Sequence, residues 1–82
     1  MARQKYYYLI EEIDLETEFK IRYMVKVFTT EEKARKKLQR YFEVEEFSAE
    51  RTGNKKPHDT LDLGFFRTHD NREYRIRQAF AG

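Results

Sequence analysis

The fold is decided by residues 19–34, FKIRYMVKVFTTEEKA, where an alternating segment runs directly into a helix start. Residues 19–28 alternate with a period of two, which predicts a strand with one buried face. The face that we expect to be buried carries Phe19, Ile21, Tyr23, Val25 and Val27. The opposite face carries Lys20, Arg22, Met24, Lys26 and Phe28.

A helix is predicted over residues 30–47. Thr29 and Glu32 fit a capping box, in which the threonine oxygen accepts a hydrogen bond from the Glu32 amide and the glutamate reaches back. Spacings of three and four residues predict a mostly buried stripe made of Ala34, Leu38, Tyr41, Phe42, Glu45 and Phe47. The outward face would carry Lys33, Lys36, Lys37 and Arg40.

A hairpin over residues 5–28 is expected before the helix. Residues 6–13 are rich in Tyr, Leu and Ile and are followed by an acidic turn, so they read as the first strand of this hairpin. After the helix, residues 48–59 have the polar composition of a loop, with Gly53-Asn54 as a turn and Pro57 limiting any further helix.

A second hairpin is expected over residues 60–80. Its turn would be His69-Asp70-Asn71, because Asp and Asn tolerate a positive φ. Leu61, Leu63 and Phe65 alternate before the turn, and Tyr74, Ile76 and Phe80 alternate after it. The order β-β-α-β-β therefore predicts an α+β domain with one helix packed on one face of a four-stranded, mainly antiparallel sheet.

Length and composition restrict the class of protein. The chain has 82 residues and no cysteine, so we expect a single domain over residues 1–82 without disulfides. The longest apolar run, residues 6–10, is far shorter than the roughly 20 residues of a membrane span. We therefore expect a soluble, cytoplasmic protein that does not bind membranes.

The charges occur in blocks, although they nearly cancel to a net charge of +2. Residues 11–18 carry −5, residues 19–42 carry +6, residues 43–50 carry −4 and residues 51–58 carry +3. Blocks of this kind create charged patches that orient a partner. A small overall charge with this many acids argues against an indiscriminate polyanion binder.

The candidate binding residues form two basic surfaces. The sheet face away from the helix is expected to expose Lys20, Arg22, Lys26, Arg75 and Arg77, with Arg67 joining them. Met24, Phe28 and residues 6–8 would lie among these charges. The helix supplies the second surface, with Lys33, Lys37 and Arg40 as its binding residues. Such surfaces suit a protein interface, or a platform for RNA or single-stranded DNA.

No catalytic constellation is evident, so we expect a protein that is not an enzyme and has no metal or cofactor. Gly53, Gly64 and Gly82 form no phosphate-binding motif. His58 and His69 lie in predicted turns, and the main interpretation is that they are solvated. A small ribonuclease using one of these histidines is a third function class.

The segment Val27-Phe28-Thr29-Thr30-Glu31-Glu32-Lys33-Ala34 resembles the junction between hairpin and helix in small accessory proteins of bacteriophages and mobile elements. The resemblance covers eight residues and implies binding to a host or defence protein rather than catalysis. The leading hypothesis is therefore a protein-binding module, with an inhibitor of a host nuclease or defence complex as its concrete form. Nucleic-acid binding through the same sheet face is the alternative, and a homodimer through the sheet edges or faces also fits.

Overall fold

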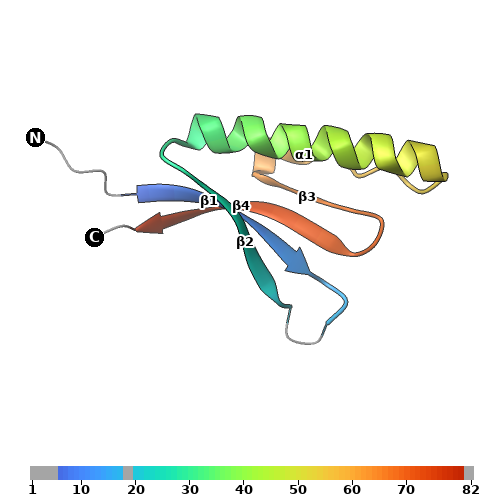
Figure 1. The fold of residues 1–82 in the computed structure, drawn as a ribbon, viewed down its shortest axis with the longest axis horizontal. Coiled ribbons are helices and arrows are strands. Elements are labelled where there is room, and N and C mark those ends of the chain that lie inside the picture. The colour runs from blue at the N-terminus through green and yellow to red at the C-terminus, as the bar shows by residue number, and fades with distance from the viewer. Residues whose placement is uncertain (1–5, 18–19, 81–82) are drawn as a thin grey trace, which may run out of the picture.

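The computed structural model describes residues 6–17 and 20–80, which form one antiparallel sheet and one long helix (Figure 1). In chain order the elements are β1 (Tyr6–Asp14), β2 (Arg22–Phe28), α1 (Glu31–Thr52), a 3-10 helix (Leu61–Leu63), β3 (Phe65–Arg67) and β4 (Arg72–Phe80). This confirms the predicted α+β class and the β-β-α-β-β order. Phe19, where we expected the second strand to begin, lies outside the described residues.

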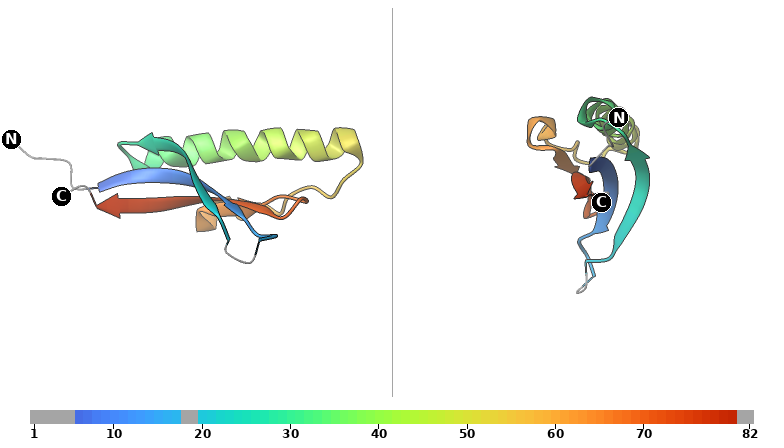
Figure 2. Two further views of the ribbon diagram at one scale, coloured as in Figure 1. Left: turned by 60° about the horizontal axis from the view of Figure 1, so that its bottom comes forward. Right: turned by 90° about the vertical axis from the view of Figure 1, so that its left-hand side faces the viewer.

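The two hairpins meet through β1 and β4, which form the centre of the sheet. The strand order is β2-β1-β4-β3, and every neighbouring pair is antiparallel. Tyr6 lies opposite Phe80 and Asp14 lies opposite Arg72, so β1 and β4 pair along their whole length. Figure 2 shows α1 lying along one face of a strongly twisted sheet, whose other face is covered by no helix or strand of the described residues. We call this uncovered side the open face.

Helix α1 and its N-cap each begin one residue later than predicted. The N-cap is Thr30, whose Oγ1 accepts a hydrogen bond from the Lys33 amide at 3.3 Å. The predicted pairing of Thr29 with Glu32 is therefore wrong, because either threonine could have filled the cap position. Glu31 and Glu32 still occupy the first turn, where the helix dipole favours anions.

Helix α1 also continues five residues past the predicted end at residue 47 and stops at Thr52. Gly53 adopts φ 70°, a left-handed conformation that glycine accepts readily, and the Asn54 amide donates to the Ala49 carbonyl at 2.8 Å. The predicted loop over residues 48–59 is therefore too long at its start, since Gly53-Asn54 terminates the helix rather than turning within a loop. No helix within the described residues has both the length and the hydropathy to cross a membrane.

The core lies between α1 and the central strands. Its fully buried centre is Phe66 of β3, whose ring stacks on Tyr74 at 5.2 Å and meets the edge of Phe42 at 5.4 Å. Ile10 and Leu38 complete the buried cluster. The predicted burial of Ala34, Leu38 and Phe42 is confirmed, whereas Phe47 is 61% exposed, because the buried face of α1 continues through Ala49, seven residues after Phe42.

The second hairpin is shorter than predicted on its first side. Residues 61–63 form a 3-10 turn, and Gly64 at φ 85° then starts the strand one residue out of phase with the expected alternation. As a result Phe66 enters the core, while Leu63 is 66% exposed. The predicted turn is confirmed, with Asn71 at φ 59° and the Asn71 amide donating to the Thr68 carbonyl.

Candidate functional site

Four arginines gather on the open face of the sheet. They were all predicted to lie on this face, and they come from three strands: Arg22, Arg67, Arg75 and Arg77. Direct strand neighbours in the register share a face, and alternation along β4 places Glu73, Arg75 and Arg77 together. The open face therefore carries the cationic surface that the sequence predicts.

The four arginines are held in two pairs, and each pair contacts one buried glutamate that was not predicted as a site residue. Glu11, which is only 6% exposed, accepts a hydrogen bond from Arg77 Nε at 3.0 Å. Arg22 Nη1 lies 3.8 Å from the same carboxylate oxygen. Glu11 therefore compensates part of the positive charge of β2 and β4. Leu9 and Ile13 lie two residues before and after Glu11, so the three side chains share one face of β1. The two apolar neighbours are the sequence signal that Glu11 is buried.

Glu73 plays the same part at the other side of the open face. Arg75 Nε donates to Glu73 Oε2 at 2.7 Å, and Arg67 Nε donates to Glu73 Oε1 at 2.9 Å. Burial by itself would raise the pKa of Glu73, but the hydrogen bonds and charges of the two arginines outweigh it and leave this pKa below the ordinary value. Glu73 is therefore held as an anion in the fold.

The aromatic ring beside these arginines already has a cation packed on it. Phe65 lies on the open face, and the guanidinium of Arg75 stands 4.5 Å above its ring centroid, with Arg67 at 6.0 Å. A base that stacked on the face of Phe65 covered by Arg75 would have to displace this guanidinium, which also binds Glu73. This arrangement weakens the platform interpretation of the open face.

The remaining two residues predicted for the open face lie elsewhere. The register shifts between Ile10 and Glu11, which leaves Val25 as an extra residue in β2. Because of this bulge, Lys26 is paired with Ile10 and lies on the α1 side of the sheet. Lys20 precedes β2, at φ 48°. The bulge also moves Phe28 to the α1 side, where it packs against the core.

Strand β2 is an uncovered edge of the sheet, contrary to the prediction that one of its faces is buried. Its large apolar side chains, together with Ile21 just before it, are between 38% and 63% exposed: Ile21, Tyr23, Met24, Val25 and Val27. On its outer side no other strand pairs with β2 among the described residues. Another strand could therefore pair with the outer backbone groups of β2, apart from the irregularity at Val25.

The helix residues predicted to bind form a second basic surface. A shallow groove of about 580 Å³ has Phe28 at one side and is otherwise lined by Lys33, Lys36, Lys37, Gln39, Arg40 and Glu43. Lys36 pairs with Glu32 at 3.7 Å, and Lys37 Nζ lies 5.4 Å from the centroid of the Tyr41 ring. This groove opens beside the last residue of β2.

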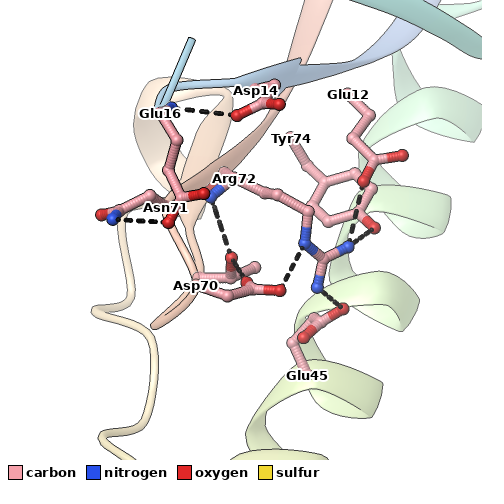
Figure 3. Close-up of polar contacts among 9 residues, drawn as sticks. Glu12, Asp14, Glu16, Glu45, Asp70, Asn71, Arg72 and Tyr74 are labelled. Carbon is pink, nitrogen blue, oxygen red and sulfur yellow. Dashed lines mark hydrogen bonds and ion pairs between the residues drawn. The ribbon is translucent and has the colours of Figure 1, made fainter.

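A third polar cluster surrounds Arg72 and ties the helix to both hairpins (Figure 3). The guanidinium of Arg72 contacts three carboxylates: Glu12 at 3.0 Å, Glu45 at 3.0 Å and Asp70 at 2.9 Å. Arg72 Nη1 also donates to the Tyr74 hydroxyl at 2.8 Å. Burial by itself would lower the pKa of Arg72, but these acids outweigh it and raise the pKa. The cluster therefore stabilises the packing of the helix on the two hairpins.

Comparison with known proteins identifies no relative of this chain: no family model, curated protein or solved structure matches it. Within the part of the chain that the structure describes, no His, Cys, Asp or Glu side chains are grouped as a metal site would require.

Proposed function

We propose that the protein is a non-enzymatic module that binds another protein, and that it does so by adding an extended segment of that partner to the free edge of β2. The exposure of five large apolar side chains on and beside this edge strand carries the proposal. Water solvates such a surface poorly, and natural edge strands are normally short, charged or covered. Strand addition would satisfy the outer backbone groups and bury these side chains together.

Strand β1, which already pairs with β2, indicates which residue types the partner segment would carry. Strand β1 combines apolar residues with Glu11, Glu12 and Asp14, whereas β2 carries Arg22 and Lys26 and no acid. Glu11 pairs with Arg22 across this boundary. A partner segment of the same kind, apolar residues alternating with acids, would complement the outer edge of β2 in the same way.

A second copy of the chain fits this edge poorly. Pairing β2 with β2 of another molecule would place two copies of Arg22 and Lys26 on one strand pair with no acid between them. Like charges on adjacent strands repel, and edge lysines are a common device against self-association. We therefore favour a different protein over a homodimer as the partner. An inhibitor of a host nuclease or defence complex, acting in the cytoplasm, is the form of this module that the resemblance of residues 27–34 suggests.

Nucleic acid is the weaker candidate for this role. Only one exposed side chain of β2, Tyr23, is aromatic, and the Phe65 ring on the open face lies under Arg75. The open-face arginines are also engaged with Glu11 and Glu73. Their charge is therefore less available to phosphates than the count of arginines implies.

The test uses a double variant, Y23K/V25K, which places two lysines on the exposed edge. Both positions are exposed, so the fold should persist, while docking of an apolar strand should be lost. The immobilised wild type is incubated with host lysate, the retained protein is identified and purified, and its affinity is measured. We expect binding to fall at least tenfold in the double variant, with protection of β2 amides from hydrogen exchange in the wild-type complex.

The control is Val44→Lys, an exposed apolar position on α1. This variant should retain the partner. Equal binding by Y23K/V25K would refute docking at β2, and recovery of nucleic acid without protein would support the alternative function. A wild-type dimer that Y23K/V25K converts to monomer would show that the edge pairs with a second copy.

A further inference from the structure

The two histidines, which have no part in the proposed function, line the same hollow. This hollow has a volume of about 250 Å³ and lies between the segment after α1 and the turn that joins β3 to β4. Its lining residues are Lys55, Lys56, Pro57, His58, Arg67, Thr68 and His69. The basic block at residues 51–58 and both histidines therefore meet at one place in the fold.

The lining of the hollow combines cations and hydrogen-bond donors without any acid. Lys55, Lys56 and Arg67 carry permanent positive charge, and each histidine offers at least one N–H donor in either protonation state. Two of the cations have an acid outside the hollow: Lys56 Nζ lies 3.8 Å from Glu50, and Arg67 Nε donates to Glu73.

Two of these cations retain free donors. Among the hydrogen bonds within the described residues, Arg67 uses Nε alone, which leaves its two terminal nitrogens available as donors. Lys55 has no ion pair among those residues. Donors therefore remain for a ligand even though Arg67 is held in place by Glu73.

We propose that this hollow is a binding site for a phosphate dianion, either free phosphate or the terminal phosphate of a small monoester. Converging lysine, arginine and histidine donors match the several acceptor oxygens of such a group. The volume suits one phosphate group with little attached to it. A dianion gains more than a nucleic-acid diester from charges converging on one point, because a diester carries one charge and requires a track of cations.

The site is separate from the edge proposed to bind protein. Figure 1 shows the C-terminal end of α1 and the turn between β3 and β4 at the same end of the molecule, with β3 on the opposite side of the sheet from β2. No residue lines both the hollow and the β2 edge. Phosphate could therefore bind whether or not a protein partner occupies β2.

The experiment is a titration of the protein with inorganic phosphate, followed by amide NMR at ionic strength held constant with chloride. Saturable shifts are expected at the amides of residues 55, 56, 58 and 67–69. The double variant K55Q/H58Q should weaken binding at least tenfold, and both positions are exposed, so the fold should survive. The control Lys36→Gln also removes one exposed basic side chain, but from α1, and should bind phosphate like the wild type.

Shifts that stay linear with phosphate concentration and spread over all lysines would overturn the proposal. Equal weakening by K55Q/H58Q and by Lys36→Gln would do the same, because binding would then follow net charge. An RNA hexamer without terminal phosphates provides the last arm. If it displaces phosphate from the hollow, the site recognises diesters and the proposed preference for a dianion is wrong.

Discussion

Arg77 Nε donates to Glu11 Oε1 at 3.0 Å across the central strand pair, although the residue directly opposite Glu11 in the register is Arg75. The contact is therefore diagonal. It leaves Arg75 to bind Glu73 at 2.7 Å, so both arginines in the middle of β4 meet a buried carboxylate. The open face consequently presents less free positive charge than its arginines alone would give.

Removing these two carboxylates should convert the open face into a stronger polyanion-binding surface. We expect the double variant E11Q/E73Q to elute from a heparin column at higher salt than the wild type, because four arginines lose their internal counter-charges. The control E31Q/E43Q removes two exposed acids of α1 and has the same net charge. Identical elution of the two variants would show that only net charge matters and that Glu11 and Glu73 do not mask the arginines.

Arg72→Ala should destabilise the fold because it leaves three carboxylates without their shared cation. Glu12, Glu45 and Asp70 all contact this guanidinium, which is mostly buried. Loss of a partly buried cation of this kind costs about 2 to 4 kcal/mol of the free energy of unfolding. Urea denaturation measures the change. Lys36→Ala breaks only an exposed pair with Glu32 and should cost no more than about 0.5 kcal/mol.

Acid should destabilise the protein through Asp70 and Glu73. Burial alone would raise both pKa values, but hydrogen bonds from Thr68 and Arg72 to Asp70, and from Arg75 and Arg67 to Glu73, lower them from the ordinary 3.8 and 4.5. The unfolded chain then binds protons that the folded chain does not, so stability present above these ordinary values declines as pH falls through them.

The measurement is the urea midpoint between about pH 6 and about pH 3. We expect the midpoint to fall over this range in the wild type and to fall less steeply in the double variant D70N/E73Q. Parallel pH profiles for the two proteins would mean that other carboxylates cause the acid sensitivity.

Phe66→Ala should be among the most damaging substitutions in the chain. The side chain is fully buried between the rings of Phe42 and Tyr74, and removing a buried phenylalanine costs about 3 to 5 kcal/mol. That loss is a large fraction of the free energy of unfolding of a domain of this size, so the melting temperature should fall steeply. Phe47→Ala removes the same group from an exposed position, and its melting temperature should stay close to that of the wild type.

Features that depend on nearby residues could be predicted from the sequence. The left-handed Asn71 in its turn follows from the backbone preferences of one residue, and the burial of Leu38 and Phe42 follows from helical spacing. Periodicity also placed Arg75 and Arg77 correctly on the open face, because β4 is regular. Each of these predictions uses information within a few residues of the position concerned.

The errors concern relationships between distant segments. Alternation shows which residues of β2 share a face, but whether that face is covered depends on the strand order, which leaves β2 at an edge. The 3-10 turn at residues 61–63 exchanges Phe65 for Phe66 in the core, a shift of one residue that apolar alternation cannot show. Glu11 could not be matched with Arg77, since the two are 66 residues apart.

The bulge at Val25 makes β2 a strand of two halves whose side chains are out of phase with each other. Deleting this one residue would restore continuous alternation and leave Arg22 opposite Ile13 on the open face, whereas a regular ladder that kept Val25 would move Arg22 opposite Asp14 and turn it away from Glu11. The bulge therefore absorbs one residue that would otherwise move Arg22 to the wrong face of the strand. The composition of the open face thus depends on how the backbone of the hairpin accommodates this extra residue, as well as on the arginines themselves.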